Sequence, residues 1–279
     1  MKRYILFLAA VISALSLTGC LQNETTIHLN KDGSGTLVEE TTLGAQMLAM
    51  MDQMSAMGGA GADHKDPVAE MFSEEKAKAR AVKLGEGVTL EKSEAIEKNG
   101  NKGGRSTYHF ADINKLKISP SDALKDMSPM AAMAPPKKKP TKPIDFKYAD
   151  GTLTIAMPEP KEKPEGEKPA ADAPDDGGPL GKGAPGAQEI AMMKQMMGDM
   201  KMSLKVVIEP GIAETNATNR EGNTITLVEM EMGKLFDNPE VMKNFGKIDK
   251  HDPAAAIEMM KGIPGIKFEA QKEVTVKVN

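Results

Sequence analysis

The sequence predicts an α+β fold, in which an antiparallel sheet built of hairpins has helices packed on one face. Two observations support this prediction. Apolar and polar residues alternate through several runs, and Asp-Gly or Gly/Asn turns join these runs in pairs, as in half-buried hairpins. Between them lie stretches with helical apolar spacing, several of which start at an Asp-Pro, Ser-Pro or Asn-Pro pair.

In the first half of the chain, hairpins are expected around Asp32-Gly33, residues 98–104 and Asp150-Gly151. Helices are expected over 44–57 and, after an Asp66 N-cap, over 67–84, with a shorter one at 119–127. The 67–84 helix should bury one apolar stripe and end at Gly85. That stripe consists of Val68, Met71, Phe72, Ala79 and Val82.

The second half predicts a methionine-rich helix at 187–200, then a strand at 203–210 and its returning partner at 224–232. The apolar phase of the returning strand shifts between Leu227 and Val228, which indicates a β-bulge. Two short helices should start at Asn238-Pro239 and Asp252-Pro253. Residues 266–278 alternate throughout and predict one long, half-buried antiparallel strand.

Two proline-rich stretches divide the chain. The segment 158–187 has Leu180 as its only large apolar side chain, so it cannot bury enough surface to offset the entropy of ordering. The expected organisation is a signal peptide at 1–19, one α+β domain in three parts (20–128, 144–157 and 188–279), a Pro/Lys linker at 129–143 and a disordered insertion at 158–187.

The N-terminus has the layout of a secretory signal peptide, with Lys2 and Arg3 before a short apolar run. Its end, Leu17-Thr18-Gly19-Cys20, resembles the lipobox of bacterial lipoproteins, and Cys20 is the only cysteine. This resemblance implies that a diacylglyceryl group is attached to the Cys20 thiol and that a signal peptidase cleaves between Gly19 and Cys20. It implies a lipid-anchored protein of the cell envelope that faces outside the cytoplasm. Leu21, rather than Asp, favours the outer membrane by resemblance to Gram-negative sorting patterns.

The charge of the chain argues against nucleic acid as a partner. The formal net charge is -4, and removing Lys2 and Arg3 with the signal peptide makes it -6. Membrane attachment is therefore expected to come from the lipid rather than from a basic patch.

Several short motifs add a family resemblance. They are the strand that follows the lipobox almost directly, "NKDGSGTL" at 30–37, "STYHFADINKL" at 106–116 and "EGNTITL" at 221–227. Together they resemble the LppM-type domain of bacterial lipoproteins. The resemblance implies a membrane-anchored, non-enzymatic module with a lipid or an envelope protein as its ligand.

No catalytic constellation is visible, so the chain is not expected to be an enzyme or to hold a cofactor. The four histidines (His28, His64, His109 and His251) are scattered, without a second ligand at metal-site spacing. Asn30, Asp32, Ser34 and Gly35 match the first positions of an EF-hand loop, but Thr41 stands where its bidentate Glu is needed. A hairpin turn is therefore expected there.

The 22 methionines leave the function open between two classes. At helical spacing they can be core filler, which is the favoured interpretation, or they can line a groove for a lipid or a partner helix. Thioethers also suit Cu(I). The expected function is a lipid-anchored binding or structural module, and the alternative is a Cu(I)-handling lipoprotein. The two methionine stripes are Met47, Met50, Met51 and Met54, and Met192, Met193, Met196, Met197 and Met200.

Overall fold

The computed structural model describes residues 21–57, 67–98, 100–119, 142–158, 197–245 and 262–279, with four helical positions between 188 and 194. The expected signal peptide and Cys20 lie outside these residues, as do 129–141 of the linker and 159–187 of the insertion. The short helices expected beyond Ser119 and at Asp252-Pro253 also lie outside them.

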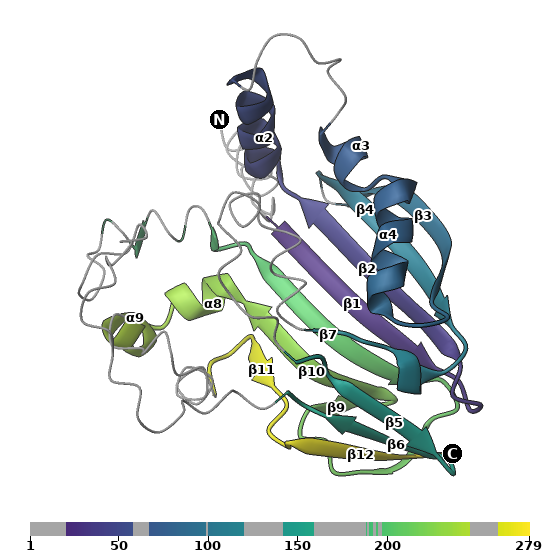
Figure 1. Cartoon of the computed structure of the whole chain (residues 1–279). Helices are drawn as coiled ribbons and strands as arrows, with labels where there is room; N and C mark the ends of the chain where they lie inside the picture. The colour runs from purple at the N-terminus through teal and green to yellow at the C-terminus, as the bar shows by residue number, and fades with distance from the viewer. Residues whose placement is uncertain are drawn as a thin grey trace, which may run out of the picture.

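A large twisted sheet forms the body of the molecule (Figure 1). Its strand order is β11-β10-β7-β1-β2-β4-β3, and the short β9 pairs with β10. The strands are β1 (Leu21–Leu29), β2 (Gly35–Leu43), β3 (Thr89–Lys98), β4 (Asn101–Phe110), β7 (Lys201–Ile208), β9 (Arg220–Glu221), β10 (Thr224–Glu231) and β11 (Ile266–Phe268).

The expectation of a purely antiparallel sheet is wrong at one position. Strand β1 pairs in parallel with β7, with Asn23 opposite Met202 and Thr26 opposite Lys205. The other pairs in this sheet are antiparallel. Parallel neighbours need a long crossover, and here most of the chain lies between the two strands.

A second sheet packs across one end of the large one (Figure 1). Its order is β5-β6-β12-β8. The main core contains Ile27 and Val206 from the large sheet together with Leu153 and Val276 from the small one. The α+β class is confirmed, and part of the covering layer is a sheet rather than helices. The strands are β5 (Asp145–Ala149), β6 (Thr152–Ala156), β8 (Ile212–Thr215) and β12 (Glu273–Val278).

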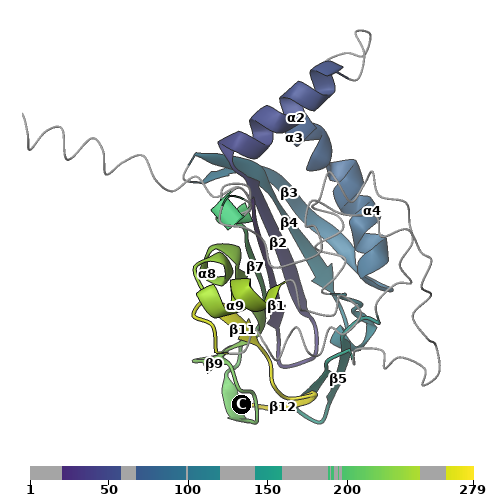
Figure 2. The ribbon, with the colours of Figure 1, turned by 90° about the vertical axis from the view of Figure 1, so that its left-hand side faces the viewer.

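The helices surround the large sheet (Figures 1 and 2). Helix α4 lies along the sheet face that the small sheet also covers, which we call the inner face, and α2 projects from the end where β2 finishes. The helices are α2 (Ala45–Met57), α3 (Pro67–Met71), α4 (Glu74–Leu84), the 3-10 helix η1 (Ile113–Lys115), α8 (Met232–Phe236) and α9 (Pro239–Phe245).

The opposite face of the large sheet, the outer face, is polar. Cross-strand ion pairs run along it: Lys205 lies 2.7 Å from Glu24, Arg105 lies 2.8 Å from Glu40, and Lys201 contacts Glu231. Such exposed pairs add little stability each, but they make this face suited to water.

The helix expected over 67–84 is broken, which changes the face it buries. The backbone is extended at Ser73, so α3 ends and α4 begins a new phase. Ala77, Ala81 and Leu84 are buried, whereas Val82 is 80% exposed. The expected stripe through Ala79 and Val82 is therefore wrong, because it was counted across the break.

The long C-terminal strand is also divided. Ile266 and Phe268 belong to β11 in the large sheet, while β12 belongs to the small one. Between them the Glu269 carboxylate accepts hydrogen bonds from the backbone N–H groups of Thr218 and Gln271, at 3.0 Å each. These bonds hold the chain where it crosses between sheets. Apolar and polar residues alternate both in β11 and in β12. The pattern therefore gave no sign that the two strands belong to different sheets.

The β-bulge expected in the strand that is now β10 is confirmed. The register of β10 against β7 shifts between Thr226 and Val228, with Leu227 as the extra residue.

The phase of α4 can be tested with two neighbouring substitutions. Ala81→Lys places an ammonium in the core and should lower the free energy of unfolding by at least about 2 kcal/mol. Val82→Lys should change it by less than about 0.5 kcal/mol, because the side chain is in water. Urea unfolding followed by circular dichroism measures both. The reverse order of the two variants would contradict the helix phase described here.

Candidate functional site

Strand β1 carries the residues from which the site is built. Its odd-numbered residues are buried and its even-numbered residues are half-buried. Ile27 and Leu29 enter the main core, and Leu21 lies at the other end, so Asn23 and Thr25 are polar residues on the buried side. A polar pair on the buried side of a strand was a signal in the sequence, and the sequence analysis missed it.

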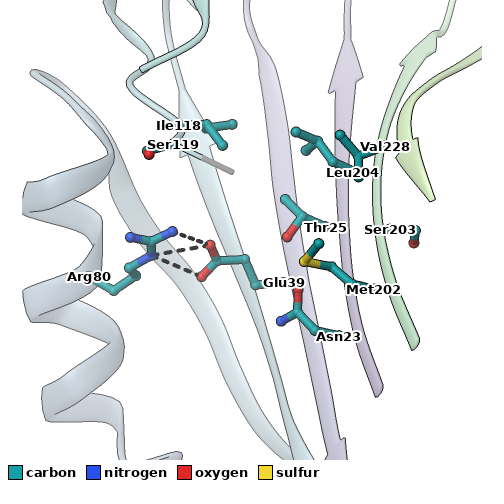
Figure 3. Close-up of a pocket in the computed structure, with 10 residues that line it drawn as sticks. All are labelled: Asn23, Thr25, Glu39, Arg80, Ile118, Ser119, Met202, Ser203, Leu204 and Val228. Carbon is teal, nitrogen blue, oxygen red and sulfur yellow. Dashed lines mark hydrogen bonds and ion pairs between the residues drawn. The ribbon is translucent and has the colours of Figure 1, made fainter. Parts of the chain in front are cut away.

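Around Asn23 and Thr25 lies an open hollow on the inner face, which we call the inner hollow (Figure 3). It has about 370 Å³ of empty space including its mouth, and its enclosed part has room for roughly one water-sized group. One wall is polar and the other is apolar. The polar wall consists of Asn23, Thr25, Glu39 and Arg80, and the mainly apolar wall of Ile118, Met202, Leu204 and Val228; Ser119 and Ser203 lie beside the latter residues.

An ion pair closes the polar wall. The Arg80 guanidinium on α4 donates from Nε and Nη2 to Glu39 Oε1 on β2, at 3.1 and 2.8 Å (Figure 3). The two side chains are 16% and 19% exposed. A forked pair this sheltered is stronger than a surface ion pair and fixes the orientation of both groups. It also ties α4 to the sheet at the edge of the inner hollow.

Asn23 is the unusual residue of this wall. It is 7% exposed, and its Nδ2 donates to Thr41 Oγ1 at 2.8 Å. Its Oδ1 is buried, and among the described residues it has no hydrogen-bond partner. Since the Thr41 hydroxyl can donate or accept, turning the amide over would only leave Nδ2 unpaired instead. Leaving such a group without a partner costs about 1–3 kcal/mol.

Tyr108 lies beside this ion pair in the core. It is 1% exposed, and burial, together with the negative charge of Glu39, raises the pKa of its phenol to about 12. The phenol therefore stays neutral at any physiological pH. Tyr108 packs in the main core and does not line the inner hollow.

The described methionines of the two stripes are divided between two clusters. Met47, Met51 and Met200 pack half-buried around Leu21 and Leu43. We call this group, completed by Leu48, Met71 and Phe72, the rim cluster. Met197 packs elsewhere, in the cluster that contains Phe236. Met192, Met193 and Met196 and the side chains of Met50 and Met54 lie outside what the structure describes.

The polar turn after β1 is the expected hairpin. The Ser34 N–H and hydroxyl both donate to Asp32 Oδ1, at 3.0 and 2.6 Å, and these bonds lower the pKa of Asp32.

His28 pairs with Glu209 at 2.7 Å. Within the described ranges, no three His, Cys, Asp or Glu side chains are grouped to hold a metal ion.

Across the same ranges, no helix is long and apolar enough to cross a membrane.

No protein-family model matches the chain, and no curated protein matches it either. A solved structure, the NMR structure of the folded domain of Mycobacterium tuberculosis LppM, is similar over 78% of this chain and 87% of that chain. The sequence identity is 11% and the TM-score is 0.31. Values this low transfer no residue role and no ligand.

The environment of Tyr108 predicts a pH dependence. In residues 21–279 with Tyr148→Phe, Tyr108 is the only phenol, and its ultraviolet absorbance should titrate near pH 12 in the folded protein. Because the folded state holds this proton above the unfolded pKa of 10.0, the free energy of unfolding should fall by roughly 2 kcal/mol from pH 10 to 12. Adding Glu39→Gln should move the titration to lower pH. Titration near pH 10 before unfolding would contradict the buried position.

Proposed function

We propose that this chain is a lipid-anchored binding module of the bacterial cell envelope, with its ligand in the inner hollow. The observation that carries the proposal is the buried, unpaired Asn23 Oδ1 on the polar wall. Buried polar groups are nearly always paired, so an exception on a residue that lines a hollow is a candidate ligand contact. The proposed role of the inner hollow is binding: forked hydrogen bonds hold Arg80 and Glu39 in place, and the Tyr108 phenol stays protonated.

The two walls define the ligand chemistry. A hydroxyl or amide N–H of the ligand donates to Asn23 Oδ1, and an apolar portion packs on Met202, Leu204 and Val228. The enclosed volume admits only a small group, so the remainder of the ligand lies at the mouth of the inner hollow.

The anchor part of the proposal rests on the lipobox-like Leu17-Thr18-Gly19-Cys20 and the preceding signal sequence. Cleavage before Cys20 leaves a mature chain that enters the large sheet at once, since β1 starts at Leu21. The neutral Leu21 after the cysteine favours the outer membrane over the inner one.

The anchor can be tested by metabolic labelling. The full chain expressed in a bacterium should incorporate an alkyne analogue of palmitate, and Cys20→Ala should lose this label completely. Mass spectrometry of the mature protein should show diacylglyceryl on its first residue. Label that persists in Cys20→Ala would contradict the proposed anchor.

The ligand site can be tested by native mass spectrometry of residues 21–279, exported in soluble form. A bound organic molecule is expected, and Asn23→Ala should reduce its occupancy about tenfold, the value of one lost hydrogen bond. Asn101→Ala is the matched control. Asn101 is 1% exposed and also has an unpaired Oδ1, but it does not line the inner hollow.

Three outcomes are distinguished. The binding role of the inner hollow is contradicted if Asn23→Ala and Asn101→Ala reduce the occupancy of the bound molecule equally. It is also contradicted if the protein carries no bound molecule. Bound copper favours the second candidate function, Cu(I) handling. One observation supports that candidate: the rim cluster gathers four thioethers, a ligand type suited to Cu(I), from Met47, Met51, Met71 and Met200. Met47→Leu with Met200→Leu should then abolish copper binding.

A further inference from the structure

The rim cluster lies where the lipid anchor would leave the protein. Leu21 is 2% exposed and packs in this cluster with Leu43. Cys20 is joined to Leu21 directly, so the two Cα atoms are about 3.8 Å apart. Acyl chains attached to Cys20 therefore start at the edge of the rim cluster, with no flexible tether between them and the folded domain.

Helix α2 extends this apolar end of the molecule. Its sequence is AQMLAMMDQMSAM, and Asp52 is the only charged residue in it. One side of α2 contributes to the rim cluster through Met47, Leu48 and Met51. The exposed residues of α2 are Ala45, Gln46, Ala49, Asp52 and Gln53, so the other side of the helix carries small and polar side chains. A helix with so little charge is normally covered by other parts of the protein on all sides. The described residues cover only one side of α2.

The far end of the molecule is different in character. Strand β1 ends there in the polar turn with Lys31 and Asp32, and the small sheet lies at that end (Figures 1 and 2). In both views, α2 and the strands of the small sheet are at opposite ends. The molecule therefore has one methionine-rich end, at which Glu97, Lys98 and Lys102 of the β3–β4 hairpin are also exposed, and one polar end.

We propose that the rim cluster and the exposed side of α2 lie against the bilayer surface that holds the Cys20 anchor. The proposal rests on the proposed lipidation of Cys20. The half-buried side chains of Met47, Met51 and Phe72 supply apolar contact with the acyl region, a second attachment signal beside the covalent lipid. Flexible thioether side chains suit such a surface, because they adapt to a disordered apolar partner.

This orientation also determines how far the inner hollow lies from the membrane. Asn23 is the third residue after Cys20 along an extended strand, so it lies about 10 Å from the anchor point. The mouth of the inner hollow then opens close to the lipid headgroups, while the small sheet points away from the membrane.

The test uses the full lipidated chain in vesicles. The Cys20 sulfur is consumed by the lipid, so one introduced cysteine is the only free thiol. Ala49→Cys on α2 and Ala213→Cys on β8 are matched variants, because both alanines are exposed and they lie on opposite ends of the molecule. Each is labelled with the same fluorophore and placed in phosphatidylethanolamine/phosphatidylglycerol vesicles with brominated acyl chains. Bromine should quench the label at position 49 several-fold more than the label at position 213.

The outcomes separate this inference from the proposed function. If the protein carries diacylglyceryl and remains on the vesicles, but the two labels are quenched equally, the bilayer contact of α2 is wrong and the anchor stands. If the mature protein carries no lipid, the proposed anchor itself fails. Protection of the position 49 label without quenching by bromine would assign this end to a protein partner and overturn the bilayer contact.

Discussion

The position of β1 in the centre of the large sheet is the constraint on which the rest of the structure depends. Held between β2 and β7, it sends alternate residues to the inner face. In chain order these are Leu21 in the rim cluster, Asn23 and Thr25 in the inner hollow, and Ile27 and Leu29 in the main core. A shift of one residue would turn all of them to the outer face. One strand therefore links the proposed anchor, the proposed ligand site and the core.

The inner hollow interrupts the interior at an energetic cost. Sheltered ion pairs such as Arg80–Glu39 commonly stabilise less than apolar side chains of the same volume. The buried Asn23 Oδ1 accepts no hydrogen bond from the residues that the structure describes. The main core offsets this cost with fully buried side chains from both sheets, including Ile155 and Val276. Polar groups kept at such cost in one hollow are typical of a binding site, where stability is exchanged for function.

Local features of the fold could be predicted from the sequence, and long-range ones could not. The Asp-Gly hairpins, the bulge at Leu227 and the end of α4 at Gly85 depend on residues close together in the chain. The parallel pairing of β1 with β7 and the two-sheet arrangement depend on which distant strands meet, which alternation does not encode. The inner hollow could not be predicted for the same reason, since Asn23, Arg80 and Val228 come from separate elements. Cys20 could be singled out because its motif is contiguous.

The register of β1 against β7 is the most direct test of this account. Residues 21–279 contain no cysteine, so a disulfide between introduced cysteines reports one contact. Thr26 lies opposite Lys205, and Val207 lies two positions further along β7. Thr26→Cys with Lys205→Cys should form an intramolecular disulfide under mild oxidation, because paired Cα atoms in neighbouring strands are within disulfide reach. Thr26→Cys with Val207→Cys should stay reduced. A disulfide in the second variant and none in the first would move Asn23 away from Met202 and contradict the account.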